Sequence, residues 1–121
     1  MTTDKNLYNE TLKRRIELIQ KSLGTKNKEY AHKEHPYRNF IMGAAHIRST
    51  PHKVLWGYML KHFISVEDII EGRNQKPVTE DYVEEKIGDM INYLILLEGM
   101  LKKTIRERDK DIAPNQLKLN L

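Results

Sequence analysis

The chain has 121 residues, of which 39% are hydrophobic, 7% aromatic and 31% charged, and its formal net charge is +4 at pH 7. This length predicts one domain, 1–121. A domain of this size can gain stability from oligomerisation. The absence of cysteine excludes disulfides and thiolate metal sites. No window approaches the roughly 18 apolar residues of a membrane span, and runs of alternating polarity are scarce. We therefore expect an all-α, soluble, cytoplasmic protein that has no membrane partner.

Apolar residues that recur at helical spacing predict a bundle of four to five helices. The first begins after Thr3 or Asp4, either of which can cap it, and ends at Gly24. Its apolar stripe consists of Tyr8, Leu12, Ile16, Ile19 and Leu23. The basic cluster at 13–15 is interpreted as a solvated face, with phosphate contact as the alternative.

The segment 25–36, TKNKEYAHKEHP, is basic and polar and has no apolar period, so it is predicted to be a loop. Loops between helices often carry binding residues. Lys28 and Tyr30 are therefore candidates for contact with an anionic ligand. His32 and His35 have a spacing compatible with a metal, but no matching second pair of ligands accompanies them.

A short helix is predicted at 37–48, and Arg38 at its start is expected to face the same side as the basic loop. The next helix, about 51–71, is capped by Ser49 or Thr50 and has proline at its first position. Because short connections join antiparallel neighbours, this helix should pair with the one that follows.

That following helix, about 80–105, is capped by Thr79 after a short turn, and the antiparallel pair should form the centre of the bundle. Its predicted core stripe consists of Val83, Ile87, Met90, Ile91, Leu94, Leu97 and Leu101. The residues at 106–121 are interpreted as a tail.

Two acidic pairs flank the turn between these helices. Asp68 and Glu71 are three positions apart and Glu85 and Asp89 are four apart, so each pair shares one helix face. Antiparallel packing is expected to bring the four carboxylates together, where Mg²⁺ or Mn²⁺ would neutralise them. With Lys61 gripping a phosphate, such a site could hydrolyse a phosphoanhydride. The alternative is structural, because acids near a helix N-terminus are favoured by its dipole.

Three segments carry a resemblance to a known family: KNKEYAHKEHPYRNF, VLWGYMLKHFISVEDII and VEEKIGDMINYLILLEGML. They resemble phage and prophage proteins of the nucleotide-modification-associated domain type, over roughly 26–101. More distantly, they are similar to the all-α MazG-like nucleoside triphosphate pyrophosphatases. That likeness implies an all-α fold and a Mg²⁺ ion held by acids of two adjacent helices. It also implies release of a nucleoside monophosphate and pyrophosphate, in the host cytoplasm if the chain is phage-encoded.

By this likeness, Glu85 and Asp89 form the second acidic motif and carry the catalysis, while Asp68 and Glu71 stand for the first. Glu85 and Asp89 have three residues between them where the enzymes usually have two, and Lys61 lies where more acid is usual. Nucleotide binding without turnover is therefore the alternative to hydrolysis.

The sequence thus predicts a protein that binds nucleotides through Mg²⁺, as a homodimer or homotetramer that buries the apolar flanks of the long helix. The residues expected to contact substrate are Lys28, Tyr30, Arg38, Lys61 and Asn92. The alternative is a non-catalytic helical protein that sequesters a nucleotide or binds a host protein or DNA.

Overall fold

The computed structural model describes residues 3–30 and 35–111, and of 23–30 it describes the backbone alone. Four helices and no strand occur in these ranges: α1 (Asp4–Tyr30), α2 (Arg38–Ile47), α3 (Pro51–Ile70) and α4 (Glu80–Lys110). The all-α prediction is confirmed. None of the four is long and apolar enough to cross a bilayer.

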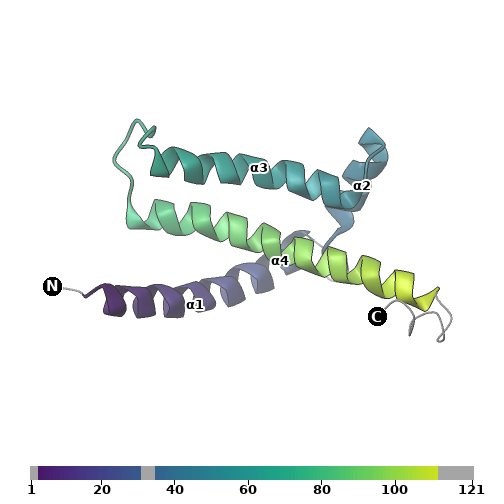
Figure 1. Ribbon diagram of the computed structural model, residues 1–121, viewed down its shortest axis with the longest axis horizontal. Coiled ribbons are helices and arrows are strands. Elements are labelled where there is room, and N and C mark those ends of the chain that lie inside the picture. The colour runs from purple at the N-terminus through teal and green to yellow at the C-terminus, as the bar shows by residue number, and fades with distance from the viewer. Residues whose placement is uncertain (1–2, 31–34, 112–121) are drawn as a thin grey trace.

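The centre of the fold is the antiparallel pair of α3 and α4, and α1 packs along the other side of α4 (Figure 1). Both helices of the pair begin at the predicted threonine caps. The Thr50 hydroxyl accepts the Lys53 N–H at 3.3 Å, and the Thr79 hydroxyl accepts the Tyr82 N–H at 3.1 Å. Gly72 turns the chain between them with φ +67°, a conformation that favours glycine.

The first helix is longer than the sequence indicated. It continues through Gly24 to Tyr30, so the prediction that a loop begins at residue 25 was wrong. A glycine in a helix interior costs only about 1 kcal/mol, and 25–30 contains no proline, so nothing there forces the helix to end.

The long helix also passes its predicted end and reaches Lys110, so 106–110 is helical and not part of a tail. Ion pairs one turn apart support this extension. The Lys103 ammonium lies 3.9 Å from the Glu107 carboxylate. One turn earlier, the Lys102 ammonium lies 2.6 Å from the Glu98 carboxylate, whose pKa is lowered by this hydrogen bond. Residues 112–121 lie outside the described part of the chain.

The core lies where α2 covers one end of the α3–α4 pair. Phe40, Leu55 and Met100 are its buried members, and Leu55 is fully enclosed. Partly buried side chains surround them: Tyr37, Val54, Tyr93, Leu96 and Leu97. The rings interlock edge-on, since the Phe40 and Tyr93 centroids lie 6.3 Å apart at 69°.

The core-facing side of α4 differs in part from the predicted stripe. Leu94 and Leu101 are each 47% exposed, whereas Met100, which the stripe omits, is buried. The physical reason is that α2 and α3 approach the face that carries Tyr93 and Met100. Helical periodicity locates apolar faces, but it does not tell which of them has a partner.

Candidate functional site

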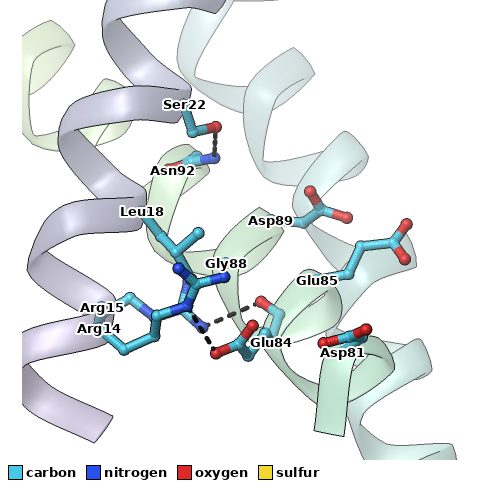
Figure 2. A pocket seen from close by; sticks show the side chains of 10 residues that line it. All are labelled: Arg14, Arg15, Leu18, Ser22, Asp81, Glu84, Glu85, Gly88, Asp89 and Asn92. Carbon is cyan, nitrogen blue, oxygen red and sulfur yellow. Dashed lines mark hydrogen bonds and ion pairs between the residues drawn. The ribbon is translucent and has the colours of Figure 1, made fainter. Parts of the chain in front are cut away.

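A cleft of about 430 Å³ lies between α1 and the first half of α4 (Figure 2). The two helices run in the same direction there (Figure 1). Helix α1 lines the cleft with Arg14, Arg15, Leu18 and Ser22, and α4 lines it with Asp81, Glu84, Glu85, Gly88, Asp89 and Asn92. Its volume falls within the range of about 300–1,000 Å³ that is usual for small-molecule sites.

Two arginines form the cationic wall of this cleft. Arg14 Nε donates to Glu84 Oε2 at 3.3 Å, and Arg15 Nη2 donates to the Glu84 carbonyl oxygen at 3.0 Å. Gly88 makes room for the second guanidinium, because a Cβ atom built there would lie 2.7 Å from Arg15 Nη1. A side chain at 88 would therefore displace the Arg15 guanidinium from α4.

The acidic wall is formed by Glu85 and Asp89, one helical turn apart on α4. In Figure 2 both carboxylates point away from α1. Glu85 is exposed, and the Asp89 side chain is 22% exposed, with Oδ2 at 3.4 Å from Nδ1 of His62 on α3. The His62 ring is stacked on Tyr93 at 5.0 Å. Packing thus fixes the ring that contacts the Asp89 carboxylate.

The other predicted acidic pair lies elsewhere. Arg73 Nη1 lies 3.2 Å from a carboxylate oxygen of both Asp68 and Glu67, and these hydrogen bonds, the one to Asp68 first, raise the pKa of Arg73. Glu71 is exposed at the end of α3. In the ranges that the structure describes, no three His, Asp or Glu side chains are grouped so that they could hold a metal.

The register of the two helices explains this separation. Because His62 lies opposite Asp89, antiparallel packing places Asp68 opposite roughly position 83 and Glu71 opposite roughly position 80. From the sequence we expected the four carboxylates to lie together. The structure does not bring them together. The metal-binding and catalytic roles assigned to these residues stay predictions.

Asn92 is the predicted substrate contact that lies in the cleft. It is half-buried, and its side-chain amide donates to the Ser22 hydroxyl at 3.1 Å, which ties α4 to α1. This is the buried polar contact that an amide on an apolar helix requires. Its role towards substrate stays a prediction.

The remaining predicted substrate contacts are not in the cleft. Lys61 is exposed on α3, with its ammonium 5.9 Å from the Tyr58 ring centroid, and Arg38 is exposed at the start of α2. The side chains of Lys28 and Tyr30 lie outside the described part of the chain, as does His32.

Sequence reasoning missed His62 and gave the arginines only as an alternative. The cleft-lining positions of α1 have helical spacing but mixed polarity, so a search for apolar stripes overlooks them: Arg14, Arg15, Leu18 and Ser22. The contact of His62 with Asp89 can be predicted only when the register of α3 against α4 is known.

Comparison of the chain with models of protein families, with curated proteins and with solved structures gives no match. The resemblance to the phage domain and to MazG-like enzymes therefore stays a prediction. Function has to be argued from the residues of the cleft and their geometry.

Proposed function

We propose that this cleft binds the phosphates of a (deoxy)nucleoside triphosphate together with Mg²⁺. The observation that carries the proposal is the placement of Asp89. Asp89, whose side chain is 22% exposed, is a lining residue of the same cleft as Arg14 and Arg15, and its carboxylate is directed away from α1, towards His62 on α3. A carboxylate with so little access to water needs a partner, and an imidazole at 3.4 Å supplies only part of that requirement.

The arginine wall supplies phosphate-binding capacity. A guanidinium carries five N–H donors, and the contacts described above use only Nε of Arg14 and Nη2 of Arg15. The other donors can form charge-assisted, bidentate hydrogen bonds with phosphate oxygens. A triphosphate also carries more negative charge than the Glu84 carboxylate, so it can compete for Arg14.

The acidic wall fits Mg²⁺ by the chemistry of its donors. Proteins usually hold Mg²⁺ through one or two carboxylates, and waters and substrate phosphates complete the shell. Glu85 and Asp89 would be those carboxylates, and His62 would orient Asp89 as a second-sphere partner. When bound, the ion would neutralise phosphate charge and polarise the phosphoryl group. Mn²⁺ accepts the same oxygen ligands.

The proposed reaction is hydrolysis to a nucleoside monophosphate and pyrophosphate, as the resemblance implies, and binding without turnover is the alternative at the same site. We also propose a homo-oligomer, a dimer or tetramer. The rival function is non-catalytic binding of a host protein or DNA. The many large apolar side chains that the fold leaves exposed favour a protein over DNA as the partner in that case.

Substituting the two carboxylates tests the proposal. Glu85→Gln and Asp89→Asn are each expected to weaken Mg²⁺-dependent nucleotide binding about tenfold or more, because each replaces a charged Mg²⁺ ligand with a neutral amide. Titration calorimetry with and without Mg²⁺ measures this change. Glu107→Gln, at an exposed position near the other end of α4, is the matched control. Unchanged affinity in both variants would show that the carboxylates are not the site.

A further inference from the structure

The single chain leaves large hydrophobic side chains exposed on all four helices. The buried hydrophobic residues among the described side chains are few: Phe40, Ala44, Leu55, Met59 and Met100.

Much of the exposed apolar surface lies on α3, which forms an outer edge of the molecule (Figure 1). One face of α3 packs on α4 through Leu55 and His62. The face away from α4 carries large apolar side chains that are 45% to 76% exposed: Trp56, Leu60, Phe63, Ile64 and Ile70. We call these five residues the outer stripe. Trp56, Phe63 and Ile70 are seven positions apart, which is the spacing of a helix that pairs with another helix.

The charges that flank the outer stripe change sign along α3. Lys53 lies beside the stripe near the start of the helix, and Glu71 lies beside it at the end. Both are exposed, and neither has an ion-pair partner among the residues that the structure describes. If two copies of α3 pack antiparallel, each Lys53 lies near the Glu71 of the other copy, because the two ends of the helix are exchanged.

We propose that a second copy of the chain covers the outer stripe, so that α3 packs antiparallel against α3 of its partner across a two-fold axis. In such an interface every contact occurs twice, and the centre falls between Leu60 and Phe63. A membrane surface fits less well, because it attracts a uniformly basic flank and α3 ends in acids. The dimer does not depend on nucleotide binding.

The full-length chain is expected to sediment at no less than twice 14.3 kDa. Phe63→Glu should raise the dissociation constant of the dimer at least tenfold, because it places a carboxylate in the centre of an apolar contact. Lys110→Glu, at an exposed position at the end of α4, is the control and should leave the mass unchanged. Circular dichroism of each variant verifies that the helices form.

A charge exchange tests the orientation without touching the apolar contacts. Lys53→Glu and Glu71→Lys should each weaken the dimer severalfold, because each puts like charges opposite one another twice. The double variant, Lys53→Glu with Glu71→Lys, should restore the wild-type dissociation constant. A monomeric wild-type chain, a fully dimeric Phe63→Glu variant, or a double variant weaker than both single variants would overturn the proposal.

Discussion

Leu55→Ala is expected to lower the free energy of unfolding by about 2–5 kcal/mol, the usual cost of a cavity at a buried leucine. Leu55 is 0% exposed and lies where α2, α3 and α4 meet. The described core is small, so few other side chains can compensate. Urea denaturation followed by circular dichroism measures the change.

Leu94→Ala is the matched control for this substitution. The Leu94 side chain is 47% exposed on α4, so its truncation should cost less than about 1 kcal/mol. If Leu94→Ala were the more destabilising of the two, the face of α4 that packs on α2 and α3 would be wrongly assigned.

Gly99→Ala is expected to destabilise the fold by about 1–3 kcal/mol, as overpacking does. The Tyr37 hydroxyl occupies the space beside Gly99, and a Cβ built there would lie 3.2 Å from the ring carbon Cζ. The Tyr37 ring is also packed against the buried cluster of Phe40, Leu55 and Met100, which leaves it little room to turn away from Gly99. Thermal unfolding at a fixed protein concentration gives the difference.

Gly57→Ala is the control of opposite sign. A Cβ at Gly57 meets nothing within 4 Å, and alanine is favoured over glycine in a helix by about 1 kcal/mol. Replacing glycine with alanine should thus stabilise α3 at position 57, and at position 99 it should weaken the contact between α2 and α4. An increase in stability from both substitutions would contradict the packing of Tyr37 on Gly99.

The local signals in the sequence predicted the helices well, because capping and turn formation depend on a few neighbouring residues. Thr50 and Thr79 cap the helices that they were expected to cap, and Gly72 makes the turn. The end of α1 was predicted wrongly because a glycine was taken as a stop, although a long helix tolerates its small cost.

The packing faces were harder to predict because they depend on partners distant in sequence. The predicted stripe of α1 contains Tyr8, Leu12 and Ile16, which are all at least 50% exposed, and α1 packs instead through Leu18 and Ser22. An apolar stripe has the same pattern whether its partner lies in the same chain or in another one.

The candidate site was predictable only in part, because it too depends on contacts between helices that are distant in sequence. Asp89 stood out because an acid followed by an apolar run has to find a partner, and the structure places it beside His62. Asp68 shares the acidic character but not the location, since the register of α3 against α4 sets the two pairs apart. Composition and spacing within one helix contain no information about that register.

The most direct test of the central claim is the melting temperature of the wild-type chain with a panel of ribo- and deoxynucleoside triphosphates, with and without Mg²⁺. A ligand that binds the native state stabilises it by mass action and so raises the melting temperature. At a ligand concentration of one hundred times the dissociation constant, the added stability is about 2.7 kcal/mol. We predict a rise for particular nucleotides that requires Mg²⁺ and is lost in Asp89→Asn. No shift with any nucleotide, in either condition, would contradict nucleotide binding in the cleft.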